Sequence, residues 1–192
     1  MKIVANSLGK KYFKEWVISD FDYSFTDKKK YAVVGPNGSG KSTLLKVLSG
    51  YIPVTKGSVN YFSEENLIEN DTWYKSLLYV SPYTELIEEF TLEEHVNFHF
   101  NFCGSSIDYS ELLEKLSLSK ARKKRIKNFS SGMKQRLKLG LSIFSDKKIL
   151  FLDEPTMNLD AIGIDLYQNL LETYCNDKLV IIASNQSYET EQ

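Results

Sequence analysis

An apolar run that ends in a glycine-rich turn constrains the fold more than any other part of the sequence. The segment YAVV, from residue 31, is followed by GPNGSGKST and then by the apolar-periodic segment LLKVLSG. Residues 35–42 satisfy the pattern G-x-x-x-x-G-K-[ST] at every fixed position, between a predicted strand and a predicted helix. Glycines in this pattern let consecutive backbone N–H groups curl around an anion. The sequence therefore predicts a phosphate-binding loop.

The residues of this loop have separate expected roles. The ammonium of Lys41 reaches the outer phosphates of a nucleotide, at a helix end whose dipole favours the same anion. The hydroxyl of Ser42 is placed to hold Mg²⁺. The predicted nucleotide-binding residues of this loop are Gly35, Pro36, Asn37, Gly38, Ser39, Gly40, Lys41, Ser42 and Thr43.

A second apolar run ends in two acidic residues. Residues 149–152, ILFL, predict a central parallel strand buried on both faces. Asp153 and Glu154 follow at its C-terminal end, where open α/β sheets place their ligands. We expect Asp153 to hold Mg²⁺ directly or through water, and Glu154 to accept a proton from a water aimed at the γ-phosphate. Next to a phosphate loop, this pair is more than an acidic turn.

The rest of the pattern predicts an α/β fold in one domain, residues 1–192. Residues 2–25 alternate loosely and predict an antiparallel β edge. Short apolar strands at 77–80 and 179–183 join the strands above in one mostly parallel sheet. We therefore expect a P-loop NTPase core.

A helical block interrupts these strands. Thr91 is the expected N-cap of its first helix, with Glu94 three residues on as its capping-box partner. Helices between strands of one sheet predict an inserted subdomain and not a second independent domain. We therefore divide the chain into an α/β core, residues 1–83 and 129–192, and a helical subdomain at about 84–128.

Another predicted helix begins at the donor-rich segment Ser130-Ser131-Gly132. Its expected buried stripe consists of Met133, Leu137, Leu141 and Phe144, whereas Lys134, Gln135 and Lys138 lie off that stripe. Ser130 can serve as a plain N-cap. A helix end with bare N–H groups and two hydroxyls is also an anion site, so both interpretations stay open.

Charge and hydropathy limit the remaining function classes. The chain has 24 basic and 25 acidic side chains, so nothing overall points to nucleic acid. The basic run 120–127 is short, and a solvated surface is favoured over contact with nucleic acid or an anionic membrane. No apolar stretch approaches the roughly 18 residues of a membrane span, and no signal peptide is evident. Cys103 and Cys175 lie far apart and fit a reducing compartment, which predicts a cytoplasmic chain.

Two side-chain clusters have more than one interpretation. One ring among Tyr12, Phe13 and Trp16 could stack on a purine, or all three could pack an edge strand. His95 and His99 lie four residues apart on a predicted helix. A metal site needs further ligands, so a solvated or packed helix face is the ordinary interpretation.

The order of these segments resembles the nucleotide-binding domain of the ATP-binding cassette (ABC) family, over essentially the whole chain. GPNGSGKST matches that family's phosphate loop, ILFLDEP its second acidic motif with the adjoining glutamate, and NLD, ending at Asp160, its dimer-contacting loop. FSSGMKQR is similar to the LSGGQ-type signature that separates this family from small-molecule kinases. The resemblance implies ATP and Mg²⁺ as cofactors.

The resemblance also implies roles for particular residues. Tyr12 falls where the family places its adenine-stacking aromatic. In such proteins two domains close head to tail over two ATP molecules. Ser130 and Gly132 of one copy, with Ser131 between them, would then face the γ-phosphate held by Lys41 of the other.

Three positions depart from the family's pattern. Pro82 stands about where the family has a glutamine that touches Mg²⁺, and it offers no side-chain ligand. Asn185 replaces the switch histidine, and its amide can hydrogen-bond a phosphate but cannot carry a proton near neutral pH. The signature has Ser131 and Met133 in place of a glycine and a glutamine. We expect ATP and Mg²⁺ to bind, whereas each lost contact can slow hydrolysis on the order of a hundredfold.

We therefore predict an ATP-binding and ATP-hydrolysing subunit that powers a membrane transporter and dimerises with a second copy or a similar chain. The expected catalytic residues are Lys41, Glu154 and Asn185. The helical subdomain would receive a helix of a transmembrane permease, so the subunit would lie at the inner face of the membrane. Its phenylalanines, Phe90, Phe98, Phe100 and Phe102, serve that contact or form the subdomain's core. The alternative is a soluble ATP-gated switch with weak hydrolysis, in keeping with Pro82 and Asn185.

Overall fold

The computed structural model describes residues 1–68 and 72–185, which fold into two compact units. The first unit consists of Met1–Tyr79, Lys148–Glu154 and the described part of Asp177–Gln192. The second consists of Val80–Lys147 and Pro155–Asn176. The predicted division into a core and an inserted helical subdomain stays a prediction.

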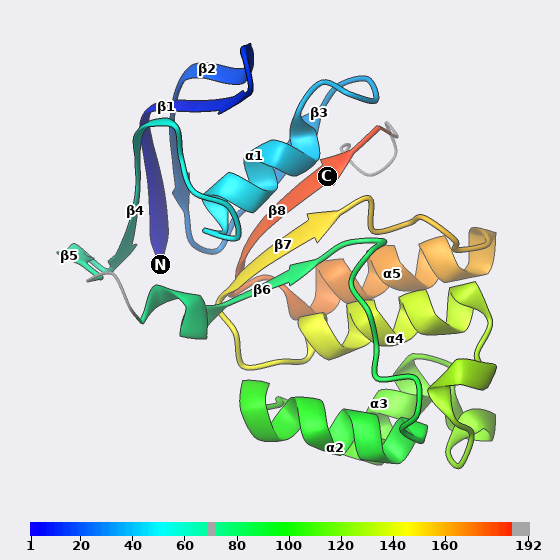
Figure 1. The fold of residues 1–192 in the computed structure, drawn as a ribbon. Coiled ribbons are helices and arrows are strands. Elements are labelled where there is room, and N and C mark those ends of the chain that lie inside the picture. The colour runs from blue at the N-terminus through cyan, green and yellow to red at the C-terminus, as the bar shows by residue number, and fades with distance from the viewer. Residues whose placement is uncertain (69–71, 186–192) are drawn as a thin grey trace. The chain divides into compact units, whose positions relative to one another are not determined.

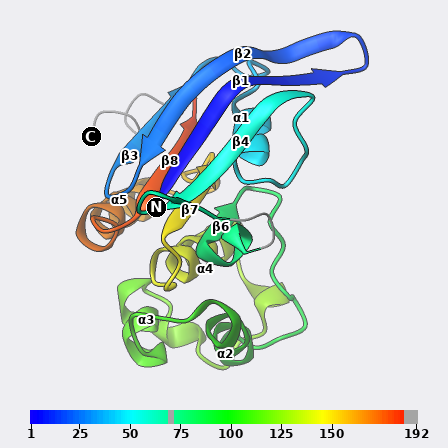
Figure 2. The same cartoon turned by 90° about the vertical axis from the view of Figure 1, so that its left-hand side faces the viewer.

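An antiparallel sheet forms one part of the first unit, with strand order β2-β1-β4-β5. Figure 2 shows β2, β1 and β4 side by side. Its strands are β1 (Lys2–Tyr12), β2 (Glu15–Thr26), β4 (Lys56–Ser63) and β5 (Asn66–Leu67). Ile3, Ala5 and Leu8 of β1 are buried, whereas much of β2 is exposed. One buried and one solvated face explain the loose alternation of the sequence.

A second sheet has the strand order β3-β8-β7-β6, in which β3, β8 and β7 run parallel (Figure 1). Its strands are β3 (Lys30–Val34), β6 (Leu77–Val80), β7 (Ile149–Asp153) and β8 (Leu179–Ser184). Every residue of β7 and β8 is buried, as the continuous apolar runs require of central parallel strands. The predicted α/β class, with a mostly parallel sheet and an antiparallel N-terminal edge, is confirmed.

Helix α1 (Lys41–Leu48) packs between these two sheets and completes the core of the first unit (Figure 1). Leu45 and Leu48 of α1 join buried side chains of β1, β7 and β8 in one apolar cluster. Burying a leucine contributes about 1.5–3 kcal/mol, so this cluster fixes the start of α1 relative to the ends of β3 and β7.

The second unit is helical. It contains α2 (Leu92–Cys103), α3 (Tyr109–Lys115), α4 (Ser131–Ile143) and α5 (Ala161–Tyr174), with short 3₁₀ turns at Ser119–Ala121 and Ile126–Asn128. A further turn, Trp73–Ser76, belongs to the first unit. Helix α4 packs on both α2 and α5. A Cβ at Gly140 of α4 would lie 2.4 Å from a methyl carbon of Leu116, so glycine lets α4 approach the end of α3 closely.

The predicted capping box of α2 is confirmed. The Thr91 hydroxyl accepts the Glu94 N–H at 3.3 Å, and the Glu94 carboxylate accepts the Thr91 N–H at 2.7 Å.

The first helix of the block, α2, begins only at Leu92, so the expectation that the block is helical from residue 84 is wrong. Thr84 instead closes a turn by accepting the Ser81 N–H at 3.0 Å. Residues 88 and 90 then pair their backbone carbonyls with the N–H groups of residues 127 and 126.

The buried face of α4 is broader than the predicted stripe, because it also includes Leu139, Ser142 and Ile143. Leu137, Leu141 and Phe144 are buried as expected, whereas Met133 is half-buried. Gln135 was expected off the stripe and is instead 2% exposed. Its amide donates to the Pro155 carbonyl at 2.7 Å, and this hydrogen bond is what makes burial of a polar side chain tolerable.

Candidate functional site

The predicted phosphate loop connects β3 to α1 in the first unit. Gly38 and Gly40 adopt φ of 81° and 94°, a region that glycine enters without strain. A Cβ at Gly40 would also lie 2.7 Å from a methyl carbon of Val17. The loop borders a hollow of about 570 Å³ whose other wall is β2. Glycine at position 40 therefore meets both a dihedral and a steric requirement.

Lys41 is folded back onto its own loop. Its ammonium donates to the Gly35 carbonyl at 2.8 Å and to the Pro36 carbonyl at 3.2 Å. It also lies 3.7 Å from a carboxylate oxygen of Glu154, and the side chain is 7% exposed. The ammonium therefore sits at the centre of the loop, where it can exchange carbonyl oxygens for those of a phosphate.

Asp153 receives hydrogen bonds on both carboxylate oxygens. The Ser42 hydroxyl donates to Oδ1 at 2.8 Å, and the Tyr79 hydroxyl donates to Oδ2 at 2.9 Å. Asp153 is 4% exposed. A serine hydroxyl beside a buried carboxylate provides the oxygen ligands that Mg²⁺ prefers, so the two predicted metal residues fit that ion.

Tyr79 is a site residue that sequence reasoning missed. Burial, followed by the nearby Asp153 carboxylate, raises the pKa of its hydroxyl far above the usual value, so it remains a donor. Tyr79 lies on β6, which neighbours β7 in the sheet, and Asp153 ends β7. The sequence signal was present as a tyrosine inside an otherwise apolar strand, but the strand order was needed to interpret it.

Glu154 and Asn185 both lie at the edge of the sheet that carries the phosphate loop. Glu154 has φ of 47°, and its N–H donates to the carbonyl of Ala183 on β8 at 2.8 Å. The Asn185 amide donates to the Asn37 side chain of the phosphate loop at 3.1 Å. The predicted loop residues, Asp153, Glu154 and Asn185 are therefore brought together in the first unit.

The aromatic cluster lies at the hairpin between β1 and β2. Tyr12 is 44% exposed, with the Lys10 ammonium 5.1 Å from its ring centre, and it does not line the hollow beside the loop. Phe13 is fully exposed. Trp16 packs over Gly9, where a Cβ would lie 2.9 Å from its ring. Trp16 packs on its own hairpin but is 47% exposed, so all three rings are accessible.

The remaining predicted residues, Ser130, Ser131 and Gly132, lie in the second unit at the start of α4. Ser130 is the N-cap, and its hydroxyl accepts the Met133 N–H at 3.2 Å. Ser130 is therefore confirmed as the N-cap. Ser131 is exposed, and a Cβ at Gly132 would lie 3.2 Å from the Asn158 carbonyl oxygen. A nucleotide-binding role for this segment stays a prediction.

The histidine pair and the basic run 120–127 also lie in the second unit. His95 and His99 are at least partly buried on α2, and their Nδ1 and Nε2 atoms, respectively, find no hydrogen-bond partner within the described ranges. Across residues 1–68 and 72–185, no three His, Cys, Asp or Glu side chains are arranged to hold a metal. The charged side chains of 120–127 are exposed, and two of them, Arg125 and Lys127, pair with Glu89. No helix in the described part of the chain is long and apolar enough to span a membrane.

Comparison with known proteins gives consistent results. A family model described as "ABC transporter" matches residues 18–157. The chain is 33% identical over 186 residues to the lantibiotic transport ATP-binding protein SrtF of Streptococcus pyogenes, covering 93% of this chain and 77% of that protein. It is 34% identical over 196 residues to the energy-coupling factor transporter ATP-binding protein EcfA1 of Thermotoga maritima, covering 97% and 73%.

The fold is also found among solved structures. A putative ABC transporter ATP-binding protein from Pyrococcus furiosus superposes with a TM-score of 0.81 at 22% identity, over 97% of this chain and 92% of that chain. An ATP-binding subunit of an ABC transporter superposes with the same TM-score, over 96% of this chain and 80% of its own. Both likenesses support the arrangement of strands and helices described above.

Proposed function

The chain belongs to the ABC transporter family as an ATP-binding subunit, and on that premise we propose that it is a Mg²⁺-dependent ATPase that powers a membrane transporter. The observation that supports this most directly is the convergence of Lys41, Ser42, Asp153 and Glu154 in the first unit. Lys41 and Ser42 open α1, whereas Asp153 ends β7 and Glu154 follows it, more than a hundred positions later. Chance does not bring a phosphate-loop lysine, a hydroxyl and two carboxylates to one place.

Each of these groups has a task in the proposed reaction. The loop N–H groups and the Lys41 ammonium bind the phosphate chain, and Asn185 hydrogen-bonds the outer phosphate from the end of β8. Ser42 and Asp153 would hold Mg²⁺, which when bound neutralises charge on the phosphates. Glu154 orients the attacking water and accepts its proton. Tyr12 would stack on the adenine ring.

The second copy would complete the site. We propose that two chains close head to tail, so that Ser130, Ser131 and Gly132 of one chain bind the outer phosphate held by the other. The start of α4 supports this role, because helix N-termini carry unpaired N–H groups and positive potential. Ser130 satisfies one of those N–H groups through its hydroxyl, and Ser131 presents a second hydroxyl to solvent.

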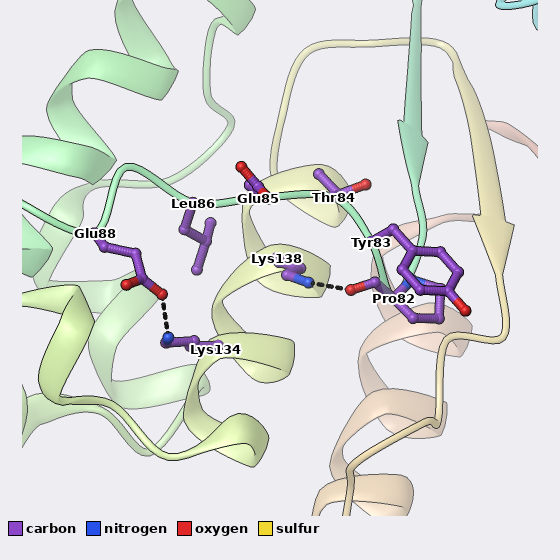
Figure 3. A pocket seen from close by; sticks show the side chains of 8 residues that line it. All are labelled: Pro82, Tyr83, Thr84, Glu85, Leu86, Glu88, Lys134 and Lys138. Carbon is purple, nitrogen blue, oxygen red and sulfur yellow. Dashed lines mark hydrogen bonds and ion pairs between the residues drawn. The ribbon is translucent and has the colours of Figure 1, made fainter.

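The second unit offers a surface for a permease. A hollow of about 730 Å³ lies between the segment 82–88 and α4, with Lys138 bonded to the Pro82 carbonyl and Lys134 paired with Glu88 (Figure 3). Tyr83, at its rim, is 86% exposed. On α2, Phe98 and Phe102 contact each other as a tilted ring pair and are also exposed, which is unlike a core. Exposed aromatic side chains beside charged ones fit an amphipathic helix from a membrane subunit, at the cytoplasmic face.

The experiment that tests this function measures ATP turnover and oligomeric state together, with and without Mg²⁺. We expect wild type to hydrolyse ATP, and Glu154→Gln to lose turnover while accumulating an ATP-bound dimer. Glu114→Gln removes a carboxylate from the exposed face of α3 and is the matched control. Tight ATP binding without turnover in either protein would instead favour the ATP-gated switch. Absence of ATP binding in wild type would refute both functions.

A further inference from the structure

We propose that Tyr79 is a positioning residue that orients the carboxylate of Asp153 for metal binding. The inference rests on the proposed Mg²⁺-dependent function, because it assigns a task toward that ion. It adds a residue from β6 to a site otherwise built from the phosphate loop and the ends of β7 and β8.

The geometry places a hydroxyl on each side of the carboxylate. Ser42 donates to Oδ1 at 2.8 Å and Tyr79 donates to Oδ2 at 2.9 Å. A carboxylate has about four acceptor positions, so two remain for a metal ion or its water ligands. Two donors on different oxygens also fix rotation of the carboxylate about its Cβ–Cγ bond. These hydrogen bonds hold Oδ1 of Asp153 toward Ser42.

Tyr79 is itself held in place. Its ring stacks on that of Tyr51, with centroids 6.0 Å apart and planes at 18°. Tyr51 lies just beyond Ser49 and Gly50, which end α1, the helix that carries Ser42. The two predicted metal residues and the two tyrosines therefore form a chain of contacts that returns from β6 to α1. Such outer partners orient metal ligands, and their loss typically weakens metal binding 10- to 100-fold.

The test is Tyr79→Phe, which removes the hydroxyl and keeps the ring. We would titrate Mn²⁺ into protein saturated with a non-hydrolysable ATP analogue and follow the electron paramagnetic resonance spectrum of the bound ion. We expect about 10- to 100-fold weaker Mn²⁺ binding and a changed spectrum. Affinity for the analogue in EDTA should stay the same, because Tyr79 contacts the carboxylate and not the phosphate loop.

Tyr61→Phe is the matched control. It removes another tyrosine hydroxyl from the same unit, whose hydrogen bond goes to the Leu48 carbonyl at 2.8 Å instead of to the site. We expect Mn²⁺ binding to be unchanged in this variant. Tyr51→Leu provides a second variant in case Tyr79→Phe does not fold. Loss of an aromatic pair should weaken Mn²⁺ binding by about two- to tenfold.

The outcomes distinguish failure of this inference from failure of the proposed Mg²⁺-dependent function. If wild type binds Mn²⁺ with the analogue and Tyr79→Phe binds it equally well, Tyr79 has no positioning role. Equal weakening in Tyr79→Phe and Tyr61→Phe would also overturn the inference, since the effect would then be one of general packing. If wild type binds the analogue but no Mn²⁺, the Mg²⁺-dependent function itself fails, and the inference with it.

Discussion

His95 makes the stability of the second unit depend on pH. The side chain is 6% exposed on α2, and within the described ranges its Nδ1 has no hydrogen-bond partner. Burial, followed by the nearby His99, lowers the pKa of His95 from 6.5 to about 4. The unfolded chain therefore binds more protons than the folded chain between these two values, so stability falls as the pH falls.

The size of the effect follows from the two pKa values. The folded and unfolded values differ by about 2.5, which corresponds to about 3 kcal/mol of unfolding free energy once the pH lies below about 4. At about pH 5 the loss is about 2 kcal/mol, and at about pH 7.5 it is close to zero. The contribution is thus fully present above the unfolded pKa and disappears as the pH falls toward the folded one.

The assay is urea unfolding at about pH 7.5 and about pH 5, for wild type and His95→Leu, followed by circular dichroism. Leucine is similar in volume to histidine and carries no titrating proton. We expect wild type to lose about 2 kcal/mol more than the variant between the two conditions. Burial also lowers the pKa of His99, so His99→Leu should remove a further part of the pH dependence. The same pH dependence in wild type and His95→Leu would refute the reasoning.

Two further substitutions test the packing described above. Gln135→Leu should lower the unfolding free energy by about 1–3 kcal/mol in urea titrations, because it leaves the buried Pro155 carbonyl without its donor; an unchanged midpoint would mean that water replaces the amide. Gly40→Ala should destabilise the first unit by about 1–3 kcal/mol more than Gly38→Ala in the same titration. Both positions have positive φ, but only a Cβ at Gly40 meets Val17, and equal losses would show that the dihedral alone matters.

Much of the site could be predicted because its parts are contiguous in sequence. The phosphate loop occupies residues 35–42 without a gap, and Asp153 and Glu154 directly follow an apolar strand. Period and composition also located β6 and the capping box of α2. The family prediction drawn from these motifs was confirmed by the matching family model and relatives.

The parts that escaped prediction depend on partners far away in the sequence. Tyr79 meets Asp153 across 74 positions, and only the order of strands brings them together. Gln135 looks like a surface residue on a helical wheel until the Pro155 carbonyl, 20 residues on, supplies an acceptor. Residues 84–90 contain no glycine or proline to argue against a helix, and their conformation is set by pairing with the segment 126–127. Local pattern carries none of this information.

Lys41 has already lost most of its hydration before any nucleotide arrives. Its ammonium is held by the carbonyls of Gly35 and Pro36 at 7% exposure. Removing water from an ammonium costs several kcal/mol, and in this chain that cost falls on folding instead of on binding. An incoming phosphate only has to replace two carbonyl oxygens around an ammonium group that is already dehydrated and positioned. A lysine of this kind lowers the stability of the free protein and raises its affinity for the nucleotide. Selection for higher stability at this position therefore lowers nucleotide affinity, and selection for higher affinity lowers stability.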